Sequence, residues 1–268
     1  MYAIELNGEK LERARQNAKV LNITNIEFIH GDALSPEVIK KVSDAQIIFC
    51  DPERLPQEEQ RTTSTIAPNI NQLLHAYSKI TTKIAIEFPP QIKEILYEGE
   101  REYCSVNGEL NRLTVYFGKL KQGDRSAIVL PGDHYLQQNP KMKVQKTNSL
   151  GKFLFEVDPA VVKADLLAEA STKTALYSQQ KAVFLTADER VEGPFFKNTF
   201  EVLDKCVFEE KTILEKLIAL KAGKVILRYS VDPKDYWRIR NSFEKKLKGN
   251  KTVVVVQFGD MAVVGERV

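Results

Sequence analysis

The chain has 268 residues, of which 43% are hydrophobic and 28% are charged, and it carries a net charge of +3 at neutral pH. This length and hydrophobic share suffice for one large or two medium globular domains, which excludes a fully disordered chain. No apolar run approaches the roughly 18 residues that a membrane-spanning helix needs, and the first residues lack a signal-peptide pattern, so we expect a cytoplasmic protein.

Cysteine and histidine are scattered along the chain. Cys50, Cys104 and Cys206 are far apart and form no Cys-x-x-Cys pair, and the three histidines show no ligand spacing. The sequence therefore predicts neither a metal site nor a disulfide. Cys50 lies in an apolar run, which favours a buried core residue over a nucleophile.

The first fifty-odd residues alternate apolar runs with helical spacing. The apolar runs cover residues 2–6, 26–29 and 47–50, and helical spacing follows the first of them. Short apolar runs separated by helices predict a parallel β-sheet covered by helices on both sides. The expected fold class is therefore α/β.

Each of these three runs leads to an acidic residue, namely Glu5, Asp32 and Asp51. Ligands of parallel sheets bind outside the carboxyl ends of the strands, so we expect the three acids to share one site. A carboxylate accepts two hydrogen bonds at once, which suits Glu5 to a pair of ribose hydroxyls. Asp32 suits an exocyclic adenine amine, with the amide of Ala33 facing a ring nitrogen. Pro52 fixes the backbone after Asp51, whose carboxylate we place where the chemistry occurs.

The order Glu5, Asp32, Asp51-Pro52 resembles the class I S-adenosylmethionine-dependent methyltransferases, whose ribose acid, adenine acid and substrate-side Asp-Pro motif follow in this order. The resemblance implies a Rossmann-like sheet and S-adenosyl-L-methionine as the cofactor. It also implies catalytic roles for Asp51 and Pro52. The residues that it implies for cofactor binding are Glu5, Leu6, Asp32, Ala33 and Asp51.

A closer resemblance covers nearly the whole chain. Its segments are Asp51-Pro-Glu-Arg54, Arg61-Thr62, Glu87-Phe-Pro-Pro90 and Ser105-Val-Asn-Gly-Glu109, and they are similar to methyltransferases with a C-terminal THUMP-like domain. Glu-Leu-Asn7, followed ten residues later by Asn17, resembles the nucleic-acid-modifying members. The resemblance implies an RNA substrate.

One part of the class I pattern is missing from this sequence. The first strand and its Gly-rich loop should precede Tyr2, and no other Gly-x-Gly-x-x-Gly loop occurs. In the family this strand lies inside the sheet, so its loss would leave two unpaired inner strand edges. We therefore expect a truncated or mis-started chain. If residues 1–268 are the complete protein, we expect weak cofactor binding by calorimetry.

Three further residues before the hairpin are candidates for substrate binding. Arg54 and Arg61 flank a polar segment that we expect to form a loop, and their guanidinium groups match a phosphate or a carboxylate. Pairing with the loop's own glutamates is an equally good interpretation. Glu87 ends the predicted strand 84–86, where the double proline borders a substrate pocket or simply makes a rigid turn.

The remainder of the chain suggests three segments. Asn107-Gly108 predicts a β-hairpin, and basic residues accumulate from Gly118 to Lys152 as hydrophobic periodicity fades. The expected organisation is a partial methyltransferase domain (1–148), a connecting segment with a helix from Asp158-Pro159 (149–194) and a small α/β THUMP-like domain (195–268).

Positive charge is concentrated near the C-terminus, where residues 197–251 contain 14 Lys and Arg against 8 Asp and Glu. The predicted helix from Tyr236 has one apolar stripe, and Arg238 and Lys245 lie on the opposite face. This face suits RNA phosphates, which adds Arg238 and Lys245 to the substrate-binding candidates. An ordinary solvated helix face has the same pattern.

The leading hypothesis is methyl transfer to a base of transfer or ribosomal RNA, with catalysis mainly by placement of the two reactants. The alternative is a non-catalytic RNA-binding protein derived from a methyltransferase. A nicotinamide dehydrogenase would share the acidic residue that binds the ribose, but Asp-Pro-Glu-Arg has no role in hydride transfer. Methyl transfer to a small molecule is a further alternative, because nothing in the sequence identifies the acceptor atom. The sequence does not indicate an oligomeric state.

Overall fold

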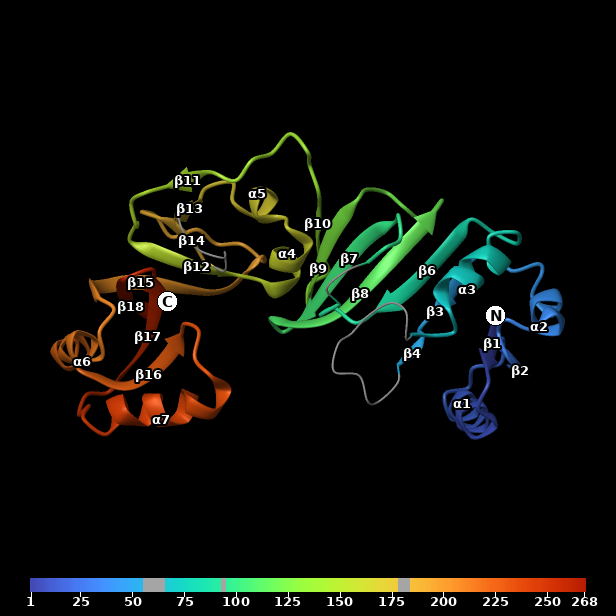
Figure 1. Cartoon of the computed structure of the whole chain (residues 1–268), viewed down its shortest axis with the longest axis horizontal. Coiled ribbons are helices and arrows are strands. Elements are labelled where there is room, and N and C mark those ends of the chain that lie inside the picture. Colours follow the sequence, from blue (N-terminus) through green and yellow to red (C-terminus); the bar gives the residue numbers. More distant parts are fainter. Residues whose placement is uncertain (55–65, 93–94, 178–183) are drawn as a thin grey trace. The chain divides into compact units, whose positions relative to one another are not determined.

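The computed structural model describes residues 1–54, 66–92, 95–177 and 184–268 (Figure 1). The described chain forms two compact units. The first consists of Met1–Tyr103 and Asn111–Arg125, and the second of Cys104–Leu110 and Ser126–Val268. Both contain helices and strands, which confirms the predicted α/β class.

The first unit begins with a small parallel layer. Its elements are β1 (Tyr2–Glu5), α1 (Gly8–Val20), β2 (Glu27–His30) and α2 (Pro36–Lys41). β1 pairs with β2 in parallel, which places Glu5 opposite His30. The side chain of Asn7 caps α1, and that of Ser35 caps α2. α1 begins three residues after the end of β1, and α2 begins six residues after the end of β2.

A second group of elements, of which only the hairpin end of β7 and β8 belongs to the second unit, surrounds a parallel strand pair. These elements are β3 (Ile48–Cys50), β4 (Glu53–Arg54), β5 (Ile66–Ala67), α3 (Ile70–Tyr77), β6 (Lys83–Phe88), β7 (Glu100–Val106) and β8 (Glu109–Gly118). β3 runs parallel to β6, and β6 runs antiparallel to β8. β3 is an end strand of a six-stranded sheet with the order β10-β9-β7-β8-β6-β3, in which β9 is Arg125–Leu130 and β10 is His134–Gln137.

One apolar core joins the two groups of the first unit. Ile29 of β2, Ile70 and Tyr77 of α3, and Ile86 of β6 are buried in the same cluster. β1 and β3 therefore belong to one folded body, although they lie in separate sheets. Within the described residues each pairs with a single strand, and Phe49 on β3 is 62% exposed.

The predicted hairpin is confirmed. Asn107 and Gly108 join β7 to β8 with φ angles of 52° and 73°. Two consecutive left-handed residues produce a turn whose twist matches the twist of the strands, which explains the Asn-Gly pair at this position.

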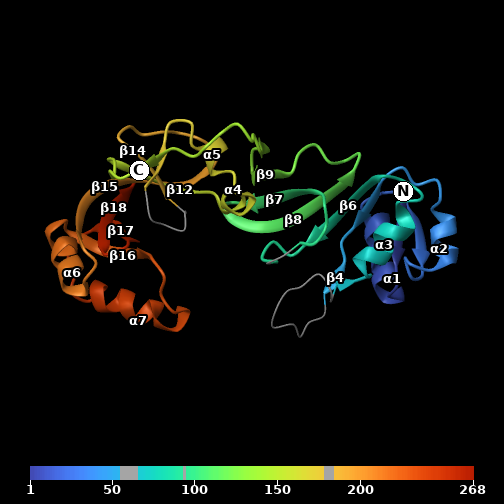
Figure 2. The same ribbon diagram turned by 45° about the horizontal axis from the view of Figure 1, so that its top comes forward.

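The second unit is built on an eight-stranded sheet with the order β11-β13-β14-β12-β15-β18-β17-β16 (Figure 2). The elements that follow β8 are β9 (Arg125–Leu130), β10 (His134–Gln137), β11 (Lys146–Thr147), β12 (Phe153–Val157), α4 (Pro159–Ala164), α5 (Leu167–Ala170), β13 (Ala175–Tyr177), β14 (Phe184–Ala187), β15 (Phe196–Val207), α6 (Glu210–Ala219), β16 (Ala222–Arg228), α7 (Pro233–Glu244), β17 (Lys251–Phe258) and β18 (Met261–Arg267).

α6 and α7 pack on the β15–β18 part of this sheet. Ile213 and Leu217 of α6 and Phe243 of α7 are buried with Val225 and Val255 of the strands. The predicted alternation of strands and helices after residue 195 is thus present. Residues 149–194, predicted as a connecting segment with a helix, contain α4 and α5 and also supply β12, β13 and β14 to the same sheet. The predicted domain boundaries remain a prediction.

Candidate active site

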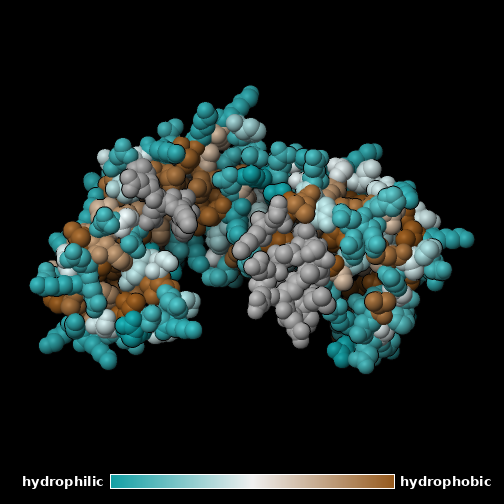
Figure 3. Space-filling model, in the orientation of Figure 1, coloured by the Kyte–Doolittle hydropathy of each residue, from teal (hydrophilic) through white to brown (hydrophobic). Residues whose placement is uncertain are grey.

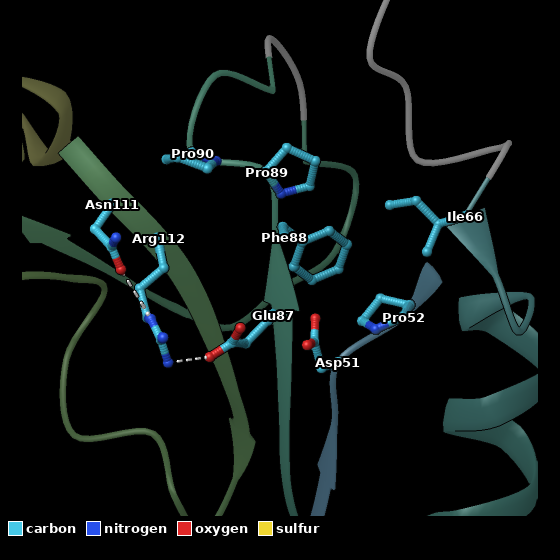
Figure 4. A pocket seen from close by; sticks show the side chains of 9 residues that line it. All are labelled: Asp51, Pro52, Ile66, Glu87, Phe88, Pro89, Pro90, Asn111 and Arg112. Atoms are coloured by element: carbon cyan, nitrogen blue, oxygen red, sulfur yellow. Dashed lines mark hydrogen bonds and ion pairs between the residues drawn. The ribbon is translucent and has the colours of Figure 1, made fainter. Parts of the chain in front are cut away.

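Asp51 lies in a hollow of about 240 Å³ in the first unit (Figure 4). The lining residues come from the end of β3, from β5, from the end of β6 and from β8, and they are Asp51, Pro52, Ile66, Glu87, Phe88, Pro89, Pro90, Asn111 and Arg112. The volume is below the roughly 300 Å³ at which pockets for drug-sized ligands begin. The hollow therefore suits a single ring better than a whole nucleotide.

Glu87 is held by a cation that the sequence did not suggest. A guanidinium N–H of Arg112 donates to Glu87 Oε1 at 2.6 Å, and Arg112 Nε donates to Asn111 Oδ1 at 3.3 Å (Figure 4). The side chain of Glu87 is 15% exposed, whereas that of Arg112 is 55% exposed. The pair fixes one carboxylate at the side of the hollow and leaves Asp51 without a cationic partner among the described residues.

Glu5 and Asp32 lie side by side at the carboxyl ends of β1 and β2. The amide of Gly31 donates to the carbonyl of Glu5 at 3.1 Å, which joins the two strand ends. Glu5 Oε1 accepts the amide of Asn7 at 2.7 Å, and Asp32 Oδ1 accepts the amide of Leu34 at 2.8 Å. Within the described residues the second oxygen of each carboxylate has no partner.

Ala33 and Leu6 complete this edge. The carbonyl of Ala33 accepts the hydroxyl of Tyr77 at 2.8 Å, while its amide has no partner among the described residues. The carbonyl of Leu6 is 3.0 Å from Nε2 of His30, and the Leu6 side chain is 69% exposed. Two carboxylates with a spare acceptor and one spare amide donor form a suitable set for the ribose and adenine of S-adenosylmethionine.

Two contacts join the first strand–helix layer to neighbouring elements of the unit. Tyr77 holds Ala33, and burial raises the pKa of its hydroxyl, with smaller contributions from nearby Cys50 and Asp32. Lys10 of α1 donates to Glu53, two residues after Asp51, at 2.8 Å. Neither Tyr77 nor Lys10 was predicted as a site residue from the sequence, because each contact depends on the tertiary fold.

The thiol of Cys50 does not qualify as a nucleophile. Burial, followed by the charge of Asp51, raises its pKa to about 11, so the thiol is protonated at neutral pH. The same side chain packs against the apolar core. The prediction of a core cysteine agrees with this environment.

The four predicted substrate-binding residues other than Glu87 fall outside the described lining of this hollow for two different reasons. Arg61 lies outside the described residues, and of Arg54 only the backbone, in β4, is described. Arg238 and Lys245 belong to α7 and its end in the second unit, where Arg238 is paired with Asp235 at 3.0 Å. Among the predicted substrate-binding residues whose side chains the structure describes, Glu87 is the one that lines the hollow.

The part of the chain that the structure describes contains no helix long and apolar enough to cross a membrane. In the same residues, no three His, Cys, Asp or Glu side chains gather as metal ligands would.

No protein-family model matches the chain. It is 24% identical over 263 residues to an uncharacterized S-adenosylmethionine-dependent methyltransferase of Mycobacterium tuberculosis CDC 1551 / Oshkosh, and equally to one of strain H37Rv. That match covers 94% of this chain and 69% of the relative. An uncharacterized RNA methyltransferase of Clostridium tetani is 36% identical over 56 residues, which are 20% of this chain and 12% of that protein.

The fold is similar to that of a putative methyltransferase from Porphyromonas gingivalis W83, with a TM-score of 0.76 and 17% identity. This similarity covers 100% of our chain and 71% of the other. The fold is thus an α/β methyltransferase fold. Over nearly its whole length the chain is also related to S-adenosylmethionine-dependent methyltransferases, which confirms the predicted enzyme class and cofactor.

Proposed function

We propose that the chain transfers the methyl group of S-adenosylmethionine to a nitrogen of an RNA base held in the Asp51 hollow. The observation that carries this proposal is the placement of Asp51 and Glu87 at the adjacent carboxyl ends of β3 and β6, in one hollow of single-ring size. The cofactor would be held by Glu5, Asp32 and Ala33, with Leu6 beside them.

The lining of the hollow favours an acceptor that donates hydrogen bonds. Asp51 and Glu87 are both acceptors, and Pro52, Pro89 and Pro90 have no backbone N–H to offer. One cation, Arg112, offsets one of the two carboxylates. A base nitrogen that carries hydrogen matches this environment better than a carbonyl or a phosphate.

In the proposed reaction, the cofactor supplies an electrophilic methyl group on a sulfonium sulfur. The acceptor nitrogen forms the new bond to that carbon, and the carbon–sulfur bond breaks with its electron pair passing to sulfur. The methylated nitrogen then loses a proton, which Asp51 accepts and releases to water. Pro52 keeps the Asp51 backbone rigid, so that the chain contributes mainly orientation.

RNA as the acceptor is supported by three observations. The Clostridium relative with a partial match is named an RNA methyltransferase. Arg238 and Lys245 are exposed on the basic second unit, and the sequence adds Arg54 and Arg61 as proposed contacts to phosphate. The THUMP-like assignment of residues 195–268 is supported by Pro194-Phe-Phe196 and Glu201-Val-Leu203, which resemble the signature of that domain. The first motif leads into β15, and the second lies within it. The cytoplasm is the proposed location.

The experiment is methyl transfer from tritiated S-adenosylmethionine to bulk transfer RNA, to ribosomal RNA or to no RNA, followed by mass spectrometry of the digested nucleosides. We expect an N-methylated nucleoside with one RNA class. Asp51→Asn should lower kcat by about a hundredfold or more because the proton acceptor is lost, while calorimetric cofactor affinity stays within about twofold.

Asp188→Asn is the matched control, because Asp188 is exposed and belongs to the second unit. Full turnover by Asp51→Asn would remove Asp51 from the active site. Absence of transfer to every RNA, with the cofactor bound, would favour the alternative of a non-catalytic RNA-binding protein.

A further inference from the structure

A second hollow, of about 590 Å³, lies in the second unit where α6 and α7 end. We call it the lysine hollow, and it is lined by Ile218, Lys221, Ala222, Lys246, Lys248, Gly249 and Asn250. Figure 3 shows hydrophilic side chains beside hydrophobic surface in the region of α6 and α7. No residue of this lining is acidic.

The floor of the lysine hollow is fixed by backbone contacts. The amide of Gly249 donates to the carbonyl of Ala222 at 3.0 Å, and a Cβ atom at Gly249 would collide with the carbonyl of Lys221. Lys221 itself has a left-handed backbone with φ of 56°. These constraints hold the segments around residues 222 and 249 together, so the backbone that carries the lysines is fixed.

The three lysines of this lining differ from three ion-paired lysines of the same unit. Lys197, Lys216 and Lys251 are each paired with a carboxylate at 2.9 to 3.0 Å. By contrast, the lysines of the hollow have no ion pair among the described residues, and all three are exposed. Their positive charge is therefore available to a ligand.

The helix ends do not cancel this charge. Each helix C-terminus carries roughly half a negative charge, so α6 and α7 together offset about one of the three ammonium groups. The amides of Lys248 and Asn250 also have no partner among the described residues and add two hydrogen-bond donors. The hollow thus has a positive excess of about two charges.

We propose that the lysine hollow binds the phosphodiester backbone of RNA. Three separate, exposed ammonium groups each give a weak contact, so a ligand with several phosphates at regular spacing gains most from them. Ile218, which is 53% exposed, offers an apolar wall for a ribose or base. A strand can enter such a hollow, whereas a flat lipid surface would meet only its rim. The choice of RNA as the polyanion rests on the proposed function.

The test uses the full chain and a short fluorescein-labelled RNA, with fluorescence anisotropy titrations over a range of KCl concentrations and no cofactor. The triple variant Lys221→Gln, Lys246→Gln, Lys248→Gln should bind at least about tenfold more weakly at low salt, and the slope of log Kd against log salt should fall by about 2, at about 0.7 per phosphate contact. The triple variant with Arg at the same positions should retain binding and verifies that the hollow tolerates substitution.

The matched control is Lys141→Gln, Lys143→Gln, Lys163→Gln, because these lysines of the second unit are also exposed and have no ion pair among the described residues. It should change Kd less than about twofold. Equal losses in both Gln triples, or none in the first, would overturn the proposal. So would loss of binding to phosphatidylserine vesicles without loss of RNA binding. Absence of methyl transfer with the expected RNA-binding pattern would contradict the proposed function and leave this inference standing.

Discussion

At the scale of single residues, Arg112 determines how the Asp51 hollow can work. Its ion pair keeps the largely buried carboxylate of Glu87 compensated and tied to β8. Removal of the cation leaves a carboxylate short of a partner, which costs about 1 to 3 kcal/mol where the group is poorly solvated. We expect Arg112→Gln to lower kcat/KM for RNA at least about tenfold. A charge-assisted hydrogen bond is among the stronger ones, and a loss of about 1.4 kcal/mol already corresponds to a factor of ten.

Arg112→Lys should lose part of this effect, since a lysine keeps the charge but cannot bond Glu87 and Asn111 together. Arg190→Gln is the control, because its pair with Glu192 is long, at 3.8 Å, and exposed. Steady-state kinetics, together with cofactor affinity measured by calorimetry, distinguish a role of Arg112 in acceptor binding from a role in supporting the fold. A large drop in cofactor affinity in Arg112→Gln would show that the residue supports the fold instead of the acceptor.

Cys50 gives a prediction about pH. Its thiol pKa is raised from 9.0 to about 11 by burial, so between these values the unfolded chain loses the proton while the folded chain keeps it. Stability must therefore fall as pH rises through this window, by on the order of 2 to 3 kcal/mol in total. Cys50→Ala should show a shallower fall between pH 9 and 11 in urea unfolding. Parallel curves for both proteins would mean that the thiol is more solvated than its burial indicates.

At the scale of elements, α3 is joined to the segment after β2 by a hydrogen bond. Its buried Tyr77 reaches Ala33 through a 2.8 Å hydrogen bond and thereby fixes the segment after β2. Tyr77→Phe leaves the Ala33 carbonyl without this donor, and we expect a loss of about 1 to 2 kcal/mol in unfolding free energy. Tyr2→Phe deletes the same atom at an exposed contact with Asp44 and should cost far less. Similar losses of unfolding free energy in both variants would show that the Tyr77–Ala33 hydrogen bond contributes no more than an exposed one.

The elements also show what the sequence could predict. Short apolar runs leading to Glu5, Asp32 and Asp51 identified the strand ends correctly, although β1, β2 and β3 are only partly buried. The Asn107-Gly108 turn was equally clear. The strands β9 and β10 were missed in the basic stretch after Gly118, where Ser126-Ala-Ile-Val-Leu130 is a short apolar run among lysines. This run lies in β9, which is placed inside the sheet between β10 and β7 and is buried or half-buried throughout.

Site residues on β8 were beyond sequence reasoning for a different reason. Arg112 follows the hairpin by four residues and looks like any exposed strand residue, and only the antiparallel pairing of β8 with β6 brings it to Glu87. The pairing register is a tertiary property, so no local pattern marks the residue. The one available signal was the hairpin itself, which predicted that residues near 112 return along the sheet.

At the scale of the whole molecule, the two units have separate apolar cores, one around Ile86 and one around Leu217. Both side chains are fully buried. Truncation of either to alanine removes packing and leaves a cavity, at a cost of about 2 to 5 kcal/mol. Because opening reactions follow local stability, each truncation should loosen its own unit first.

Hydrogen exchange with mass spectrometry checks this prediction. Leu217→Ala should speed exchange in β15, β16, β17 and β18 while β3 and β6 keep their protection, and Ile86→Ala should do the reverse. If the two units unfold separately, substitutions in the lysine hollow should leave the Asp51 hollow intact. The proposal that one unit binds RNA and the other modifies it depends on this independence. Faster hydrogen exchange in both units of both variants would instead show that the chain unfolds as one cooperative body. In that case the effects of lysine substitutions on RNA binding and on methyl transfer could not be attributed to separate sites.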